Sequence, residues 1–509
     1  MKHPAMRHLS KSRLIAFRQC PKRLWLEVHR PELREDSAST LASYQVGHQV
    51  GYAAQRIYDP MGSGAIIDAK SEGFDEAFAR SEKLLSASRQ PIFEAGFKAG
   101  GALAFADVML PVKSKGRQTW RMVEVKSSTS VKDYHLDDIA VQAFVAQLAG
   151  VELKSVALAC IDSSWVYPGK EVYRGLLFET DLTTETFART DEVKGWLAEA
   201  QRVAALKNEP KIAVGAQCHD PFECGFCNYC NRGTPQPKIS VDCLPGFTST
   251  KRDKLAENGI IELSDVPDDL LNAKQRLVKH HTLRDTVYFD SKGAAADLAP
   301  HGFPAFFLDF ETIQFAVPIW KGTSPYQQIP FQFSVHTLAA SRQLSHLAHL
   351  DLSGTDPSRA FAQALIAACG PSGPIFAYNA GFETARISGL AKRFRALAEQ
   401  LNKINSRMVD LLPIARSRYY HPSQQGSWSI KAVLPAAVPE LSYDKLVGVK
   451  DGGMAMSAYC EAIDPGTTEE RKAEIRQQLL AYCRLDTFAM VRLWQFFNGR
   501  GEPALAEED

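Results

Sequence analysis

Alternating apolar and polar positions predict two groups of strands, each followed by segments with helical spacing. The strands of the first group are rich in β-branched and aromatic residues and end at turn-forming positions. We expect these strands at 91–97, 102–110, 119–126 and 156–161. Three segments of the same region have the helical period, and Ser10 is a suitable capping residue for the first of them. We expect these helices at 10–29, 40–58 and 137–148.

The second group begins with an apolar strand that ends in acidic residues. Its strands are expected at 305–311, 331–336 and 374–379. Its helices are expected at 381–400, 407–418 and 468–498. Between the two groups, residues 233–300 combine Pro and Gly turns with short helical stretches, which is typical of a helical linker and of helix-hairpin-helix modules.

This order of elements predicts an α/β protein with about three parts, as its 509 residues also suggest. The first part is an α/β domain over 1–232. The linker covers 233–300, and a second α/β domain follows over 301–500. Residues 501–509 are expected to be a frayed tail.

Composition and charge narrow the class of partner. The net charge is +1, so nucleic-acid binding would require local basic patches rather than a global field. No apolar run approaches the roughly 18 residues of a membrane span, and residues 1–8 lack the apolar core of a signal peptide. We therefore expect a cytoplasmic protein without a membrane partner, whose ten cysteines do not form disulfides.

Two acidic patterns carry the candidate chemistry, and the first lies on the N-terminal strands. Asp107 ends one strand, and Glu124 and Lys126 share a face of the next because side chains alternate along a strand. The carboxylates can hold Mg²⁺ or Mn²⁺, and Lys126 can stabilise charge that develops on a phosphate. His48 is a candidate nitrogen ligand, and Gln142 a candidate group for orienting water or the lysine.

The second pattern lies in the C-terminal domain. Asp309 and Glu311 occupy one face of a strand, and Glu383 follows near the start of a helix. Tyr482 and Asp486 are four residues apart on the last helix and therefore point in one direction. Clustered carboxylates of this kind predict a site for divalent metal ions that cleaves phosphodiesters.

Three further features have alternative interpretations. Asp410 is either an additional acid of the second site or a helix cap. Glu94 is either a neighbour of the first site or a structural residue. The polar and aromatic segment 419–431 either contacts nucleic acid or is an ordered loop that packs Trp428 into the core.

The first pattern resembles the RecB-like branch of the PD-(D/E)XK nuclease superfamily. The resemblance implies a restriction-endonuclease-like core in which His48, Asp107 and Glu124 are metal ligands and Lys126 and Gln142 act in catalysis. The branch often has a Tyr four residues after the Gln, where this chain has Ala146.

Five cysteines add a second metal signal. Four of them lie within thirteen residues, at positions 218, 224, 227 and 230, and Cys20 lies far upstream. The resemblance to iron–sulfur members of the RecB-like branch implies a [4Fe–4S] cluster that joins the two ends of the domain. Its ligands would be Cys20, Cys218, Cys224 and Cys230, with Cys227 spare or a substitute for one of them. The alternative is Zn²⁺ on Cys218, Cys224, Cys227 and Cys230.

The second pattern resembles the DEDD exonucleases of the ribonuclease-H-like fold, in the subclass with a Tyr before the last Asp. The resemblance implies that Asp309, Glu311, Glu383 and Asp486 are metal ligands and that Tyr482 orients the attacking water. Glu383 departs from this pattern, because the third acid is normally Asp. The whole chain resembles an uncharacterised bacterial domain family that fuses the two kinds of nuclease region.

We therefore expect a metal-dependent nuclease, specifically a DNA exonuclease that acts on single strands or ends, with RNA as a further candidate substrate. The alternative is a nucleic-acid-binding iron–sulfur protein in which one or both sites are degenerate, as Glu383 and Ala146 would suggest. A purely redox role would leave both acidic patterns unexplained. The sequence identifies no protein partner.

Overall fold

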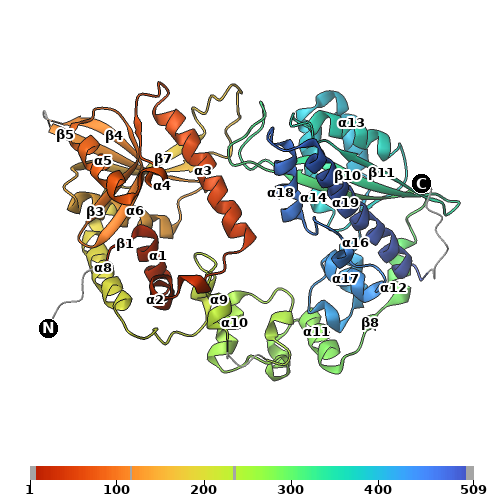
Figure 1. Ribbon diagram of the computed structural model, residues 1–509. Helices are drawn as coiled ribbons and strands as arrows, with labels where there is room; N and C mark the ends of the chain where they lie inside the picture. The colour runs from red at the N-terminus through yellow and green to blue at the C-terminus, as the bar shows by residue number, and fades with distance from the viewer. Residues whose placement is uncertain (1–6, 115–116, 233–236, 500–509) are drawn as a thin grey trace. The chain divides into compact units, whose positions relative to one another are not determined.

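The computed structural model describes residues 7–114, 117–232 and 237–499. The expected tail at 501–509 and the first residues of the linker, 233–236, lie outside this range. The chain divides into two compact units, one of Met1–Thr234 with Phe315–Gln327 and one of Pro235–Gln314 with Gln328–Asp509. The described residues form a mixed α/β structure with nineteen α-helices and three sheets (Figure 1).

The first unit contains a seven-stranded sheet in the order β2-β3-β4-β5-β6-β7, with β1 paired to β4. Strands β3, β4 and β5 form an antiparallel meander, and β6 then runs parallel to β5. The strands are β1 Leu9–Ser10, β2 Ala65–Ile66, β3 Ile92–Ala99, β4 Ala102–Ser114, β5 Arg117–Lys126, β6 Leu153–Ile161 and β7 Leu177–Asp181.

Alternation along β5 separates an apolar face from the face that carries the candidate chemistry. Val123 and Val125 point to one side, where Val125 packs with Val50 of helix α3 (Ala38–Tyr58). Met122 points to the other side, where it packs with helix α6 (Asp133–Leu148), and Glu124 shares its face. The period of two in the sequence therefore places the acidic residue on the side of α6.

Within the described residues, the first unit has nine α-helices. Ser10 caps α1 by accepting a hydrogen bond from the N–H of Arg13 at 3.4 Å, as its position predicted. Helices α1 and α2 lie beside α8, although about 170 residues separate them in the chain (Figure 1). The helices are α1 Lys11–Gln19, α2 Pro21–His29, α3 Ala38–Tyr58, α4 Ala69–Glu72, α5 Phe74–Ala87, α6 Asp133–Leu148, α7 Thr183–Ala188, α8 Thr190–Ala204 and α9 Cys227–Cys230.

The segment that follows residue 236 belongs to the second unit and is largely helical. Its helices are α10 Ser249–Glu257, α11 Ala273–Arg284 and α12 Ser291–Leu298. Short 3-10 turns, rather than a tight hairpin, connect α10 and α11. A short strand, β8 Tyr288–Phe289, pairs with β14 Tyr419–Tyr420 and so fastens this segment to the later part of the chain.

The sheet of the second unit has five strands in the order β11-β10-β9-β12-β13. Strands β9, β10 and β11 are antiparallel, whereas β12 and β13 run parallel to β9. The strands are β9 Ala305–Ile313, β10 Ile329–Leu338, β11 Leu344–Leu350, β12 Ile375–Ala377 and β13 Met408–Asp410. The helices are α13 Ser358–Ala368, α14 Gly381–Arg393, α15 Ala398–Asn405, α16 Leu411–Arg418, α17 Ile430–Ala437, α18 Gly452–Ile463 and α19 Glu469–Phe497.

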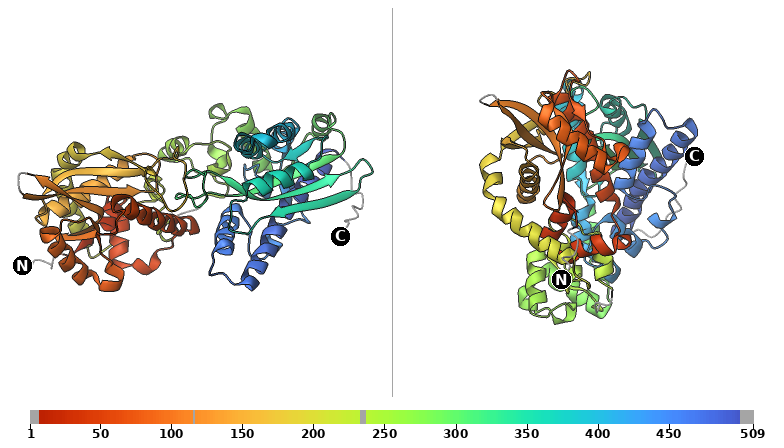
Figure 2. Two further views of the ribbon diagram at one scale, coloured as in Figure 1. Left: turned by 90° about the horizontal axis from the view of Figure 1, so that it is seen from above. Right: turned by 60° about the vertical axis from the view of Figure 1, so that its left-hand side comes forward.

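Strand β9 presents different side chains to the helices on its two faces. Phe306, Leu308 and Phe310 pack with α13, α14 and α15 in the main core of this unit. Phe307, on the opposite face, contacts Trp494 of α19 edge-to-face, with 6.0 Å between the ring centroids. Figure 2 shows the long helix α19 alongside these strands. Asp309 and Glu311, which share the face of Phe307, therefore point toward the side of α19.

Within the described residues, none of the helices is both long and apolar enough to cross a membrane.

Candidate active sites

The acidic residues of the second unit meet where β9, α14 and α19 come together. We call Asp309, Glu311, Glu383 and Asp486 the C-terminal cluster. One carboxylate oxygen each from Asp309, Glu311 and Asp486 lies within 4.8 Å of the other two. Glu383 is in the first turn of α14 and is 3% exposed. Residues from three separate elements, as much as 177 positions apart, thus form one acidic site.

Burial and mutual repulsion make this cluster electrostatically costly when all four carboxylates are charged. Burial, followed by Asp486 and Glu311, raises the pKa of Asp309 well above its usual range. Burial and the charge of Asp486 raise the pKa of Glu311 to about 8. Burial also raises the pKa of Glu383 to about 7 and that of Asp486 to about 6. A divalent cation would relieve this cost by favouring the charged forms.

The donor set fits a divalent cation. All four side chains offer carboxylate oxygens, the ligands preferred by Mg²⁺ and suitable for Mn²⁺. Oε2 of Glu383 is buried and has no hydrogen-bond partner within the described part of the chain. Because a buried charged oxygen without a partner is costly, this atom is available as a ligand.

Two tyrosines and a lysine border the C-terminal cluster. Tyr482 lies one turn before Asp486 on α19, as the spacing of four residues predicted. Its side chain is 5% exposed. The hydroxyl of Tyr443 donates a hydrogen bond of 2.5 Å to Oδ1 of Asp486. Nζ of Lys431 lies 5.2 Å from the ring centroid of Tyr482 and 5.4 Å from that of Tyr443. Tyr443 has no distinguishing sequence signal, whereas Lys431 is the last residue of the polar and aromatic segment 419–431.

Asp410 caps a helix in this structure. Its Oδ1 accepts hydrogen bonds from the N–H groups of Leu412 and Asn379, both at 2.9 Å. Its charge also contributes to the raised pKa of Glu383, after burial. Asp410 therefore caps a helix, which was one of its two interpretations. It also holds the loop that leads into α14.

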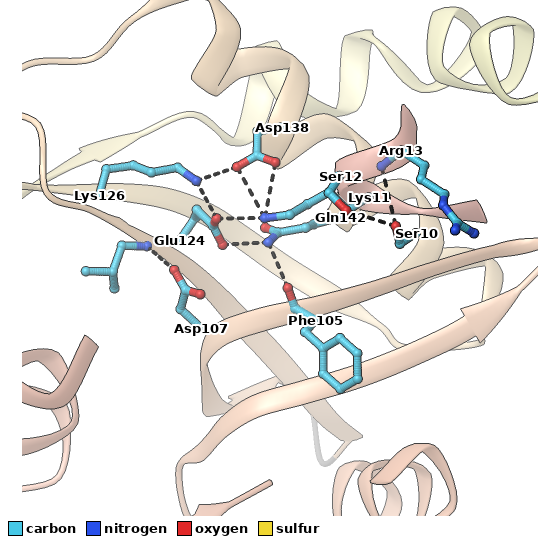
Figure 3. Close-up of polar contacts among 11 residues, drawn as sticks. Ser10, Lys11, Ser12, Arg13, Phe105, Asp107, Glu124, Lys126, Asp138 and Gln142 are labelled. Atoms are coloured by element: carbon cyan, nitrogen blue, oxygen red, sulfur yellow. Dashed lines mark hydrogen bonds and ion pairs between the residues drawn. The ribbon is translucent and has the colours of Figure 1, made fainter. Parts of the chain in front are cut away.

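In the first unit, four of the five expected site residues lie together (Figure 3). Lys126 donates to Oε1 of Glu124 at 2.7 Å, and Nε2 of Gln142 donates to Oε2 of Glu124 at 2.6 Å. Oδ2 of Asp107 accepts a hydrogen bond of 2.6 Å from the N–H of Val125. Gln142 is fully buried and therefore fixes the carboxylate of Glu124 rather than a solvent molecule.

His48 is the fifth expected residue and is not part of this network. It lies on α3 with an exposed side chain. Within the described residues it forms no hydrogen bond or ion pair with the other four. The structure therefore gives no support to a ligand role for its ring nitrogens.

The same network includes Lys11 and Asp138, which the sequence analysis missed. Nζ of Lys11 lies 3.0 Å from Oε1 of Glu124 and 3.1 Å from Oδ1 of Asp138. Lys126 also contacts Asp138 (Figure 3). Asp138 precedes Gln142 by one helical turn, so the spacing of four was an available signal. Lys11 had none, because it contacts residues more than 100 positions away.

Glu94 adds another acid beside these residues. It lies opposite Asp107 between two paired positions, since Phe93 pairs with Val108 and Ala95 with Ala106, and its φ is +56°. Burial and the charge of Glu124 raise its pKa to about 7. We call the acidic residues of this site and the two lysines that face them the N-terminal cluster. Its members are Glu94, Asp107, Glu124, Asp138, Lys11 and Lys126.

The five cysteines of the expected metal site lie near one another. Nε2 of Gln19, next to Cys20, donates to the carbonyl oxygens of Gln217 at 2.7 Å and Phe222 at 2.6 Å, which joins the early cysteine to the late segment. Burial raises the pKa of the Cys224 thiol, and both Cys218 and Cys20 contribute to the rise. All ten cysteines of the chain are free thiols.

The spacing of these sulfurs bears on the identity of a metal. No three of them lie within 4.8 Å of one another in the part of the chain that the structure describes. A tetrahedral zinc ion with bonds of about 2.3 Å would hold its sulfurs roughly 3.8 Å apart. The described residues therefore do not hold any three of these sulfurs at the spacing that a zinc ion requires.

Comparison with known families identifies one region of the second unit. A family model described as a domain of unknown function (DUF2779) matches residues 306–429, which is less than half of the chain. The matched region contains Asp309, Glu311 and Glu383 and ends before Asp486. No curated protein sequence matches the chain. The chain therefore contains a DUF2779 domain, in agreement with the expected resemblance to an uncharacterised domain family.

Proposed function

We propose that the protein is a metal-dependent phosphodiester hydrolase that acts on nucleic acid through the C-terminal cluster. The observation that carries this proposal is the approach of the Asp309, Glu311 and Asp486 carboxylates to within 4.8 Å of one another. Their arrangement on a central strand and the helix packed against it also supports a ribonuclease-H-like fold for residues 301–500.

The residues of the C-terminal cluster have distinct roles in this proposal. Asp309, Glu311 and Asp486 would hold one Mg²⁺ or Mn²⁺, and Glu383 would contribute to a second. Bound metal ions lower the pKa of water and neutralise charge on the reacting phosphate. Tyr482 points the same way as Asp486, and its hydroxyl stays protonated because burial and Asp486 raise its pKa. It can therefore donate a hydrogen bond that orients the attacking water.

Tyr443 and Lys431 stabilise the charged form of the carboxylates in the C-terminal cluster. The hydrogen bond from Tyr443 holds one oxygen of Asp486, and a carboxylate oxygen of Asp486 lies within 4.8 Å of oxygens of Asp309 and Glu311. The charge of Lys431 lowers the pKa values of Glu311 and Asp486, against the larger effect of burial. Both residues thus favour the charged carboxylates that a metal ion requires.

For the first unit we propose a PD-(D/E)XK restriction-endonuclease-like core. Asp107 and Glu124 are its candidate metal ligands, and Lys126 is its candidate catalytic residue. A specific observation favours a binding role over hydrolysis at this site: Glu124 already contacts Lys11, Lys126 and Gln142. In this second reading the N-terminal cluster is degenerate and the first unit holds nucleic acid without cutting it.

We also propose a [4Fe–4S] cluster on Cys20, Cys218, Cys224 and Cys230, with Cys227 spare. The hydrogen bonds of Gln19, next to Cys20, with the late segment support a ligand set that includes the early cysteine. The group would fasten the start of α2 to α9 and the segment before it. Ten free thiols are suited to the cytoplasm, where we place the protein.

The proposal is tested with end-labelled single strands of DNA and RNA in the presence of Mn²⁺. The protein is purified without oxygen, and its absorbance near 400 nm reports an iron–sulfur group. We expect Asp309→Asn to lose cleavage and Lys126→Ala to retain it. If Asp309→Asn cleaves as well as the parent, the assignment to the C-terminal cluster is wrong. Loss of cleavage only in Lys126→Ala would instead assign hydrolysis to the first unit.

A further inference from the structure

A cavity of about 770 Å³ in the second unit lies outside the C-terminal cluster and has a cationic lining. The residues that define its chemistry are Lys274, Arg416, Asn272, Tyr378, Asn379 and Trp428. Lys274 comes from α11 and Arg416 from α16, so two distant segments place positive charges on one cavity. No carboxylate is among its lining residues.

In the described part of the chain, the two cations have no acidic partner. Neither Lys274 nor Arg416 forms an ion pair with a carboxylate in the described residues, and the ammonium of Lys274 instead contacts the carbonyl oxygen of Arg416. Burial lowers the pKa of Lys274, and the charge of Arg416 lowers it further. Two unpaired cations beside one cavity repel each other, so a bound anion would be stabilised there.

Aromatic and polar groups complete the cavity. Nζ of Lys274 lies 4.7 Å from the ring centroid of Trp428, which is 5% exposed and donates its indole N–H to the carbonyl oxygen of Tyr419 at 2.8 Å. The tryptophan therefore belongs to the core and positions the lysine. The N-terminus of α17 also borders the cavity through Ser429 and Ile430, and Ser429 makes no capping hydrogen bond with its side chain.

Two short stretches of chain connect this cavity to the C-terminal cluster. Asn379 lines the cavity, and Glu383 follows four residues later, within about 15 Å even for a fully extended chain. Ile430 lines the cavity, and the next residue, Lys431, acts electrostatically on Glu311 and Asp486. The cavity and the acidic cluster are therefore neighbours within one unit.

We propose that this cavity binds the sugar–phosphate backbone of the strand whose phosphodiester bond lies at the C-terminal cluster, with Lys274 and Arg416 on its phosphates. This inference rests on the proposed hydrolase function. The C-terminal cluster is acidic and would by itself repel phosphate, whereas the cavity offers a cationic site for the same strand. DNA and RNA share the backbone chemistry, so both are used as probes.

The test measures binding without cleavage. Fluorescence anisotropy with EDTA follows a labelled single strand of about twelve nucleotides, as DNA and as RNA, at several salt concentrations. For the pair Lys274→Gln/Arg416→Gln we expect at least a tenfold higher Kd. The slope of log Ka against log salt is negative, and its magnitude should decrease by about 1.4, because each phosphate contact contributes about 0.7 on a single strand.

Two further variants make the result specific. Arg416 is exposed, so Arg416→Gln alone should fold normally and decrease the magnitude of the slope by about 0.7. The control pair Lys403→Gln/Lys472→Gln makes the same change in charge at two lysines that pair with surface carboxylates at 2.8 Å and 3.0 Å. We expect the control pair to bind like the parent. An equal loss in the control pair, or an unchanged Kd in the cavity pair, overturns the proposal.

Cleavage assays separate this proposal from the proposed function. With Mn²⁺, the cavity pair should raise KM and retain kcat at saturation. Cleavage with an unchanged KM contradicts the strand site and leaves the hydrolase intact. Binding that depends on Lys274 and Arg416 in a parent that never cleaves contradicts the hydrolase and leaves the strand site.

Discussion

The two acidic clusters of this protein differ in how the negative charge of their buried carboxylates is compensated. In the N-terminal cluster, Lys11 and Lys126 lie between Glu124 and Asp138 and neutralise them from within the chain. In the C-terminal cluster, no lysine or arginine forms an ion pair with any of the four acids among the described residues. Its compensation must come from protons or from a cation that binds from solution.

This difference shows why the number of acidic residues alone does not identify a metal site. Both clusters contain four carboxylates, yet only in the C-terminal cluster do three of them approach within 4.8 Å in the described structure. In the N-terminal cluster, internal lysines lower the pKa of Asp138 despite its burial, although burial raises the pKa values of Glu94 and Asp107. In the C-terminal cluster, the pKa values of all four acids are raised. The C-terminal cluster therefore gains more when a divalent cation binds.

The largest effect is expected from removing a ligand of the C-terminal cluster. Asp309→Asn should decrease cleavage by roughly 10³-fold, because loss of metal-based charge stabilisation costs several kcal/mol in the transition state. Glu124→Gln serves as the matched change in the N-terminal cluster and should have a much smaller effect. Single-turnover cleavage of labelled strands with Mn²⁺ measures both, and equal losses would contradict the contrast between the clusters.

The next effect concerns the lysines of the N-terminal cluster. Lys11→Met should lower the free energy of unfolding by about 2 kcal/mol, since it leaves a buried charge only partly compensated while Lys126 remains. Urea unfolding measures this change. Lys98→Met is the control, because Lys98 pairs at 3.1 Å with an exposed Asp75 and should contribute well under 1 kcal/mol.

A further experiment tests whether Lys11 occupies the position that a metal ion would take in the N-terminal cluster. In an Asp309→Asn background, Mn²⁺ should stabilise the Lys11→Met protein more than the protein that retains Lys11. Equal stabilisation of the two would mean that Lys11 does not compete with metal at this site.

A smaller effect is expected from the hydrogen bond that holds Asp486. Tyr443→Phe should weaken Mn²⁺ binding by about tenfold, because partners of metal ligands typically contribute that much to affinity. The dependence of cleavage on Mn²⁺ concentration measures the change, with kcat at saturating metal largely retained. A loss of kcat at every Mn²⁺ concentration would instead place Tyr443 in the catalytic step.

The smallest effect is a dependence of metal stabilisation on pH. The pKa values of Glu311 and Glu383 are about 8 and 7, above those of the unfolded chain, so their stabilising contribution is present at low pH and is lost as pH rises through 7–8. Mn²⁺ should therefore raise Tm more at pH 8 than at pH 6. The rise should be roughly 5 °C at a hundredfold excess over Kd. A shift that is independent of pH, or that persists in Glu311→Gln, would contradict this explanation.

The elements with strong local patterns were predictable from the sequence. The strand that carries Glu124 has a period of two, the strand that carries Asp309 is an apolar run that ends in acids, and the helix that carries Tyr482 and Asp486 has helical spacing. Strand β11 and helix α13 were missed. The alternating exposure of β11 follows from its place at the edge of a sheet, which its own residues do not reveal.

The sequence by itself determined which acidic and cysteine residues are candidates, because spacings of two and four residues place side chains on one face of a strand or helix. Only the tertiary structure decided that Lys11 reaches Glu124 across 113 positions and that Tyr443 reaches Asp486 across 43. It also decided that His48 is exposed and that Lys274 and Arg416 share a cavity. Contacts between distant segments depend on how elements pack, and the local period of a sequence does not contain that information.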